Sequence, residues 1–278
     1  MKIISWNVAG LRARLKNNEN GNNHINKALF SQISENGYGY KFYDIVCLQE
    51  TKCNEDQVNL ECEIEIRYPY RFWNCTKGTT QRKGLSGVSI WCTKQPKSVI
   101  DNPDFDEEGR ILALEFEEFI LINVYVPNSQ SLECERYYFR ESWNTYFMCY
   151  VQELESRYNK EIIICGDFNV AHLDIDICNP KSKKNKVAGF FDNERLDFAY
   201  LIEYADLIDI FRYLNPNLQK STYWSNFLKA ERSKYNGWGI DYYLITKELI
   251  NKVKDCKILK NILGSDHCPM ELILELYI

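Results

Sequence analysis

The stretch EIIICGDFN, residues 161–169, is a short apolar run that ends in a Gly-Asp-x-Asn turn. A run of consecutive apolar residues indicates a strand that is covered on both faces. The turn places Asp167 and Asn169 on the same side of the chain directly after this strand, although an Asx turn without function would give the same pattern. The run therefore predicts a buried strand that carries polar side chains to one edge of a sheet.

Short apolar runs separated by turn residues recur along the whole chain. The other predicted strands are KIISWNV (2–8), DIVCLQE (44–50), GVSIWCT (87–93), RILALEF (110–116), FILINVYV (119–126), IDYYLIT (240–246) and MELILELYI (270–278). Helical patterns occur at 26–35, 133–158 and 193–204, the last with Asp192 as its expected cap. Many strands and few helices predict a layered α/β sandwich, and the absence of a linker predicts a single domain over residues 1–278.

Composition narrows the class of protein. The 278 residues carry a net charge of −5, which argues against passive coating of DNA, because coating requires that many phosphates be neutralised. There are eleven cysteines but no C-x-x-C pair, which disfavours zinc ribbons and indicates buried thiols in a reducing compartment. No apolar run approaches the roughly 20 residues of a membrane span. We therefore expect an intracellular protein, cytoplasmic or nuclear, without a targeting signal.

Polar residues end several of the predicted strands. They are Asn7, Glu50, Tyr125, Asp167 with Asn169, and Asp266 with His267. Each of them alone is typical of a turn or a helix cap. Together, carboxylates and amides without a thiolate cluster favour a hard cation such as Mg²⁺. Such a set suits hydrolysis of a phosphodiester, with Glu50 on the metal, Asp167 on the attacking water and His267 among the donors to the phosphate oxygens.

Eight motifs carry a resemblance to a known family. They are SWNVAGLRA, LQETK, KGLSGV, YVPN, CGDFNVAH, NPKSKKNKVAGF, GWGIDYYLI and GSDHCP. In this order they resemble the exonuclease III family of apurinic/apyrimidinic (AP) endonucleases, and the animal-type branch is the most similar. The resemblance implies a four-layer α/β sandwich of two mainly antiparallel sheets flanked by helices, similar to deoxyribonuclease I. It also implies a monomer that cleaves duplex DNA 5′ to abasic sites in base excision repair, with Mg²⁺ or Mn²⁺, to leave a 3′-hydroxyl. It leaves room for 3′→5′ exonuclease or 3′-phosphodiesterase activity at blocked 3′ ends.

The resemblance also assigns roles to individual residues. The implied catalytic residues are Asp167, His267, Tyr125, Asn169 and Asp241, where Asp241 orients His267. The implied metal ligands are Glu50, Asn7, Asp167, Asn169 and Asp266. The implied DNA contacts are Arg12, Lys52, Asn128 and the lysines of an exposed loop, Lys181, Lys183, Lys184 and Lys186. The implied pocket for a flipped abasic sugar contains Tyr223, Trp224, Phe227 and Trp238.

The chain departs from the family pattern at a few positions. Ala9 stands where the animal-type enzymes carry an acid, Gly239 replaces a basic residue, and the segment 129–136 has no arginine near its start. The first departure leaves open whether one or two metals act. Two other functions also stay open: a phosphoesterase of the same fold that acts on undamaged DNA or inositol phosphates, and a non-catalytic DNA-binding module.

Overall fold

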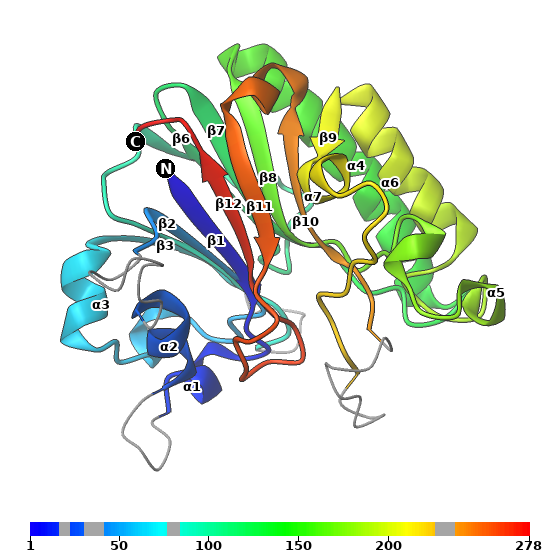
Figure 1. The fold of residues 1–278 in the computed structure, drawn as a ribbon, viewed down its shortest axis with the longest axis horizontal. Coiled ribbons are helices and arrows are strands. Elements are labelled where there is room, and N and C mark those ends of the chain that lie inside the picture. The colour runs from blue at the N-terminus through cyan, green and yellow to red at the C-terminus, as the bar shows by residue number, and fades with distance from the viewer. Residues whose placement is uncertain (17–22, 31–41, 77–83, 226–236) are drawn as a thin grey trace.

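Two six-stranded sheets lie face to face in the computed structural model, which describes residues 1–16, 23–30, 42–76, 84–225 and 237–278 (Figure 1). The first sheet has the order β11-β12-β1-β2-β4-β3 and the second β5-β6-β7-β8-β10-β9. The strands of the first sheet are β1 (Lys2–Asn7), β2 (Ile45–Gln49), β3 (Tyr70–Asn74), β4 (Val88–Cys92), β11 (Val253–Ile258) and β12 (Met270–Leu274). Those of the second are β5 (Ser98–Ile100), β6 (Ile111–Glu115), β7 (Phe119–Tyr125), β8 (Glu161–Asp167), β9 (Leu207–Asp209) and β10 (Asp241–Thr246).

Helices cover the outer face of each sheet, which gives the four expected layers. The α-helices are α1 (Leu11–Arg14), α2 (His24–Phe30), α3 (Cys62–Arg67), α4 (Glu135–Tyr158), α5 (Pro180–Lys183), α6 (Asp192–Tyr204) and α7 (Ile210–Leu214). Short 3₁₀ helices span Glu55–Gln57, Asp174–Asp176 and Lys247–Lys252. None of the helices in the described ranges is both long and apolar enough to cross a membrane.

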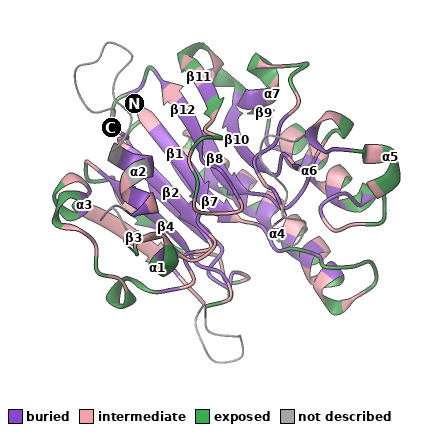
Figure 2. Cartoon of the chain, turned by 60° about the horizontal axis from the view of Figure 1, so that its bottom comes forward, coloured by how far each residue is buried: buried purple, intermediate pink, exposed green. Residues whose placement is uncertain are grey.

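Alternate residues of the central strands face different layers. In β8, Ile163 and Cys165 pack between the two sheets, whereas Ile162 and Ile164 pack under α4 and α6. The strands of the first sheet divide in the same way between the central core and a core with α2 and α3. Figure 2 shows the resulting band of buried strands. The expectation that the apolar runs are covered on both faces is therefore confirmed.

One parallel pair lies at the centre of each sheet, and all the other neighbouring strands are antiparallel. The parallel pairs are β1 with β2 and β7 with β8. The expected sandwich of two mainly antiparallel sheets is thus confirmed. This arrangement brings the C-terminal ends of the four parallel strands to one edge, together with the N-terminal ends of β10 and β12. The polar strand ends noted in the sequence therefore lie at the same edge of the molecule.

The local structure differs from the sequence-based expectation at several places. The helix expected from residue 193 begins at Asp192, and Phe191 occupies the cap position; Glu194 accepts a hydrogen bond from the Phe191 N–H (3.0 Å). The lysine-rich segment expected as a loop begins with a turn of helix, α5, because Pro180 suits a first helical position. The helix expected over 26–35 begins at His24, and its second part lies outside the described residues.

Candidate active site

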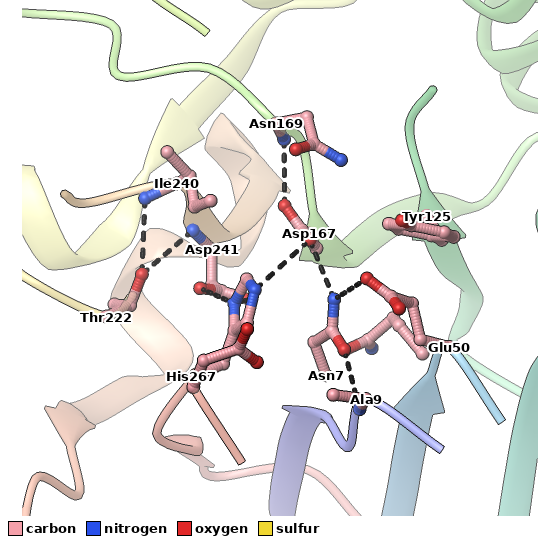
Figure 3. A network of polar contacts seen from close by, with 12 residues as sticks. Asn7, Ala9, Glu50, Tyr125, Asp167, Asn169, Thr222, Ile240, Asp241 and His267 are labelled. Atoms are coloured by element: carbon pink, nitrogen blue, oxygen red, sulfur yellow. Dashed lines mark hydrogen bonds and ion pairs between the residues drawn. The ribbon is translucent and has the colours of Figure 1, made fainter. Parts of the chain in front are cut away.

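Asn7 links the two sheets at the polar edge. Its amide nitrogen donates to Glu50 Oε1 (3.0 Å) and to Asp167 Oδ2 (2.8 Å), so that residues from β1, β2 and β8 meet at one point (Figure 3). Its amide oxygen accepts the peptide N–H of Ala9 (3.0 Å). Asn7 and Asp167 are both buried, so this contact is shielded from water. The structure therefore brings the ends of these three strands together, which their spacing in the sequence did not establish.

His267 and Asp241 form a buried pair on the other side of Asp167. The ring nitrogen Nδ1 of His267 lies 2.9 Å and 3.2 Å from the two carboxylate oxygens of Asp241, and Nε2 lies 3.7 Å from Asp167 Oδ2 (Figure 3). In the antiparallel pairing of β8 and β10, Asp241 lies directly opposite Asp167. Because Asp241 engages Nδ1, the imidazole presents Nε2 towards Asp167.

Burial and charge together change the acidity of this group. Burial alone would lower the pKa of His267, but the carboxylates of Asp241 and Asp167 outweigh it and raise the pKa to about 10. Burial raises the pKa of Asp167 to about 7, although the nearby His267 opposes the shift. The neighbouring carboxylates thus favour the charged form of His267, while burial makes Asp167 a stronger base than an exposed carboxylate.

Glu50 remains a carboxylate. Burial opposes its ionisation, but the ammonium of Lys52 and the amide of Asn7 outweigh this effect and lower the pKa of Glu50. Lys52 Nζ lies 2.7 Å from Glu50 Oε2, so this lysine, expected as a DNA contact, is engaged with the expected metal ligand. The ring of Tyr125 lies beside Glu50 in Figure 3, and burial raises the pKa of this phenol well above its usual value. Tyr125 therefore stays protonated and can donate.

The backbone after β8 holds Asp167 in place. Asn169 donates its peptide N–H to Asp167 Oδ1 (2.8 Å), while its side chain donates to the Val126 carbonyl (2.9 Å) and accepts from Asn128 (3.0 Å). Both ends of the Asn169 amide thus face the loop after β7. Gly166 precedes Asp167 with φ +143°, and a Cβ there would lie 1.9 Å from the Val124 carbonyl oxygen. Only glycine allows this close approach of β7 and β8.

Four residues of the site have backbone conformations that side chains disfavour. Ala9, Glu50, Lys52 and Asn169 all have φ between 47° and 53°. Such left-handed positions cost about 1–3 kcal/mol each and persist where surrounding contacts enforce them. They are typical of functional sites, and here they lie in the turns that follow β1, β2 and β8.

A cavity of about 410 Å³ opens beside these groups. Its lining includes Glu50, Tyr125, Asn128, Asp167, Asn169, Lys183, Tyr223, Trp238, Asp266 and His267. Of the expected pocket residues, Tyr223 and Trp238 line the cavity, but Trp224 is buried outside its lining and Phe227 lies outside the described residues. Val187, Ala188, Ser225 and Ile240 also line it and were missed in the sequence. Val187, Ala188 and Ile240 carry no sequence signal that separates a cavity wall from a core, and a lone serine such as Ser225 is typical of any loop.

Two of the expected DNA-binding residues, Asn128 and Lys183, line this cavity. Arg12 is exposed on α1. Lys183 lies half-buried above the Trp238 ring at 5.0 Å, whereas Lys181, Lys184 and Lys186 are exposed. Lys184 also forms an ion pair with Asp192 (3.3 Å). The lysine-rich segment therefore borders the cavity on one side and faces solvent on the other.

The missing basic residue at position 239 has a structural explanation. Lys220 is fully buried, and a Cβ on Gly239 would lie 2.6 Å from its Cγ. The ammonium group of Lys220 lies 3.4 Å from the centre of the Tyr242 ring and 3.8 Å from Asp209 Oδ2. Glycine at 239 thus leaves the space that the buried Lys220 side chain fills.

The donors at the edge fit a hard cation. Glu50, Asp167 and Asp266 in the cavity lining offer carboxylate oxygens, which hard divalent cations prefer, and Asn7 adds an amide oxygen beside Glu50. None of the described residues that line the cavity is a cysteine. Within the described residues, Asp167, Asp241 and His267 also offer three ligand atoms within 4.8 Å of one another. A cation at Glu50 would take the place of the Lys52 ammonium, whereas a cation at His267 would have to break its hydrogen bond to Asp241, so the side of the site around Glu50 is better suited to a cation.

The chain is similar to known proteins over its whole length. The model of the Endonuclease/Exonuclease/phosphatase family matches residues 4–267. An exodeoxyribonuclease of Bacillus subtilis (strain 168) is 37% identical over 279 residues, which cover 99% of this chain and 100% of the relative. The DNA repair nuclease APEX1 of Danio rerio is 38% identical over 278 residues, which cover 99% of this chain and 82% of the relative. A solved AP endonuclease from Archaeoglobus fulgidus matches with a TM-score of 0.80 and 26% identity, covering 99% of this chain and 100% of that one.

Proposed function

The chain belongs to the Endonuclease/Exonuclease/phosphatase family, and we propose that it is a metal-dependent DNA phosphodiesterase of base excision repair. In this proposal it cuts the backbone 5′ to an abasic site and leaves a 3′-hydroxyl, with 3′→5′ exonuclease or 3′-phosphodiesterase activity at the same site. The observation that carries it is the buried Asp167 between the Asn7–Glu50 pair and the His267–Asp241 pair, at the mouth of an aromatic cavity. The names of the fish, bacterial and archaeal relatives support the DNA substrate.

Asp167 is the proposed base for the attacking water. Its two oxygens are held by the Asn169 peptide N–H and by the Asn7 amide, so the carboxylate has a fixed direction. Burial raises the pKa of Asp167 above the usual carboxyl range, which strengthens it as a base towards water. In the proposal it takes one proton from the water as the water attacks phosphorus. The P–O3′ bond breaks, O3′ takes up a proton from solvent to become the 3′-hydroxyl, and the phosphate stays on the 5′ side of the abasic residue.

His267 is the proposed donor to the phosphate. The imidazolium, held by Asp241, presents its Nε2–H in a water-poor site where it can stabilise negative charge as it develops on the phosphate oxygens. Tyr125 keeps its proton and is placed on the opposite side of Asp167, so it can contact the same phosphate. Asn128 borders the cavity and is available to the DNA backbone.

Glu50 is the proposed principal metal ligand, with Asn7, Asp167 and Asp266 completing the oxygen donors. When bound, Mg²⁺ or Mn²⁺ would polarise the scissile phosphate and neutralise its charge. Asn169, expected among the ligands, is assigned to positioning instead, because its amide faces the loop after β7. Lys52 must leave Glu50 Oε2 for a cation to take its place, and it then becomes free for a DNA phosphate.

The cavity is the proposed site for a flipped abasic sugar. Tyr223, Trp238 and Ile240 give it apolar walls beside His267, and the Tyr223 ring lies 4.8 Å from the imidazole ring. An abasic residue loses little stacking when it leaves the duplex, so a narrow apolar pocket can select it. Arg12, Lys181, Lys183, Lys184 and Lys186 are the proposed phosphate contacts around it.

The proposal also covers the cellular compartment and the oligomeric state of the enzyme. All eleven cysteines are free, seven of them buried, which fits a reducing compartment where DNA is present, cytoplasmic or nuclear. We propose a monomer with one catalytic domain over residues 1–278, because the site is complete within one chain.

A nicking assay on a duplex with one abasic site tests the proposal. With Mg²⁺ we expect a single cut 5′ to the site and a 3′-hydroxyl end; EDTA should abolish cutting and Mg²⁺ or Mn²⁺ should restore it. Asp167→Asn and His267→Ala should each lower the rate by roughly 10²–10⁴-fold, since base and charge-stabilising groups contribute about that much.

The same assay separates the other functions. Equal or faster cleavage of an undamaged duplex or of an inositol phosphate would replace the proposal with another phosphoesterase of the same fold. Binding of the abasic duplex without any metal-dependent cutting would indicate a non-catalytic DNA-binding module. Near-normal rates in either variant would remove the assigned roles of Asp167 and His267.

A further inference from the structure

Thr222 is a fully buried residue where three segments of the chain meet. Its side-chain oxygen Oγ1 accepts the peptide N–H groups of Ile240 and Asp241, both at 3.2 Å (Figure 3). Its own N–H donates to the carbonyl of Trp238 (2.8 Å), and its hydroxyl also lies 3.4 Å from that carbonyl. Its carbonyl accepts the N–H of Cys268 (2.8 Å). Every polar group of Thr222 thus holds another segment.

The segments that Thr222 holds carry the two members of the histidine–aspartate pair. Asp241 begins β10 in the second sheet, and His267 lies just before β12 in the first sheet. The Nδ1 contact of 2.9 Å between them therefore depends on how two different sheets are placed. Thr222 holds the peptide N–H of Asp241 itself, and it holds Cys268, which directly follows His267. It fixes the backbone on both sides of this contact.

The same residue also touches the wall of the cavity. Trp238 lines the cavity, and its carbonyl is bound by the N–H of Thr222. Tyr223, the next residue, forms isolated bridges with both Trp238 and His267. A displacement of Thr222 would therefore move the cavity wall and the histidine–aspartate pair together.

From this geometry we infer that Thr222 is a positioning residue that aligns Asp241 with His267 and couples this pair to the Trp238 wall of the cavity. The part of this inference that concerns catalysis rests on the proposed function. The part that concerns alignment is a statement about the protein without substrate. Since a misplacement of about 1 Å can cost about 100-fold in rate, loss of the hydroxyl should reach the chemical step.

A purely structural role is the alternative. A buried threonine that only satisfies two peptide N–H groups would affect the free energy of unfolding when removed, but not the reaction. Thr246, at the far end of β10, provides this comparison. It is equally buried, its hydroxyl oxygen accepts the Ile162 N–H (3.1 Å), and it donates to Glu161 (2.5 Å). Thr246→Val likewise removes buried side-chain hydrogen bonds of a threonine hydroxyl, but at the end of β10 that lies farthest from Asp241.

The test compares Thr222→Val, which keeps the shape but removes the hydroxyl, with Thr222→Ser, which keeps the hydroxyl. Thr246→Val is the matched control. The first readout needs no DNA: the low-field ¹H NMR resonance of the His267 Nδ1–H reports its hydrogen bond to Asp241. The second is kcat and KM for the abasic duplex under single-turnover and steady-state conditions, with the urea midpoint measured for each variant.

We expect Thr222→Val to shift or broaden the His267 proton resonance and to lower kcat by roughly 10- to 100-fold. Thr222→Ser and Thr246→Val should keep both the resonance and kcat close to those of the unmodified protein, although Thr246→Val should lower the urea midpoint. An unchanged resonance in Thr222→Val, or a kcat no lower than that of Thr246→Val, would overturn the inference. So would a Thr222→Ser protein as impaired as Thr222→Val.

A second pair of variants serves if the Thr222→Val protein does not fold. Thr222→Ala and Thr222→Ser differ by one oxygen atom and add no bulk, so the same two readouts apply to them. A loss of the resonance in the alanine protein and its retention in the serine protein supports the inference, and equal behaviour of the two overturns it. If the resonance responds as expected but neither the unmodified protein nor any variant cuts the abasic duplex, the proposed function fails while the alignment role stands.

Discussion

His267 uses its two ring nitrogens for different tasks. Nδ1 is bound to Asp241 and Nε2 faces Asp167, so the imidazolium lies between two buried carboxylates. The sequence predicted His267, Asp167 and Asp241 as a set through their motifs. The sequence could not show that burial lowers the pKa of His267 while two carboxylates raise it. The three residues lie at the ends of different strands, so their contacts depend on the fold.

The raised pKa of His267 has a consequence for stability. Free histidine titrates near 6.5, whereas the carboxylates raise the pKa of His267 to about 10 in the folded protein. The folded state therefore binds a proton that the unfolded state has released. This stabilisation is fully present below pH about 6.5 and is lost as the pH rises towards 10, at no more than about 1.4 kcal/mol per pH unit.

Urea unfolding in EDTA at a series of pH values measures this effect. We expect the difference in free energy of unfolding between the unmodified protein and His267→Gln to shrink steadily from pH 7 towards pH 10. Groups far from His267 contribute to both proteins and cancel in the difference. The same comparison in an Asp167→Asn background removes the one neighbour whose pKa depends on His267. A difference that is constant or grows with pH would contradict the raised pKa.

The strands that the sequence predicted and those that it missed differ in position. All eight predicted strands lie in the interior of the two sheets. The four missed strands are the outer strands: β3 and β11 in the first sheet, and β5 and β9 in the second. Interior strands are buried on both faces and appear in the sequence as continuous apolar runs. The edge strand Val253–Ile258 alternates with lysine and aspartate, which face solvent and discourage pairing with another chain.

Helix α4 supports the site through one buried cation that the sequence did not single out. Arg140 donates to the carbonyls of Pro127 (2.8 Å), Phe168 (2.9 Å) and Asn169 (2.9 Å), and Glu194 of α6 lies 3.5 Å from it. The loops after β7 and β8, which carry Asn128 and Asn169, are thus held together by a helix behind them. An arginine within a long helix of mixed charged and aromatic residues gives no sequence sign of this inward contact.

Replacement of Arg140 should therefore cost far more than replacement of another arginine of the same helix. Arg140→Met leaves three carbonyls and the buried Glu194 without their cation, and we expect a loss of roughly 3–5 kcal/mol in the free energy of unfolding. Arg157→Met removes an exposed pair with Glu153 and should cost no more than about 1 kcal/mol. Thermal and urea unfolding of the two variants give the comparison; similar losses would show that the Arg140 contacts contribute little.

At the scale of the molecule, a net charge of −5 coexists with a local group of lysines beside the cavity. The protein as a whole repels DNA, so binding must depend on the few cations placed near the site. Lys181, Lys184 and Lys186 are exposed there, next to α5. Lys94, Lys247 and Lys254 are also exposed, but they follow or begin strands at the opposite edge of the sheets.

Salt dependence of DNA binding distinguishes the two groups of lysines. Each phosphate neutralised contributes about 0.9 to the slope of log Kobs against log salt concentration. Lys181, Lys184 and Lys186 changed together to Gln should reduce this slope by about 2 to 3, while the same change at Lys94, Lys247 and Lys254 should leave it nearly unchanged. Fluorescence anisotropy with an abasic duplex in EDTA measures this slope for each triple variant. Equal slopes in the two variants would exclude Lys181, Lys184 and Lys186 as phosphate contacts.

The interior strands and the residues at their ends could be predicted from the sequence, because both depend on local features: continuous burial of short runs and a turn directly after them. Asn7, Glu50, Asp167 and His267 could be named from their motifs. Only the tertiary structure decided how they meet, since Asn7 and Asp167 are 160 residues apart and their contact depends on the packing of two sheets. The same packing placed Trp224 outside the cavity, set Lys52 on Glu50, and brought Thr222 between Asp241 and His267, where no local pattern could have indicated it.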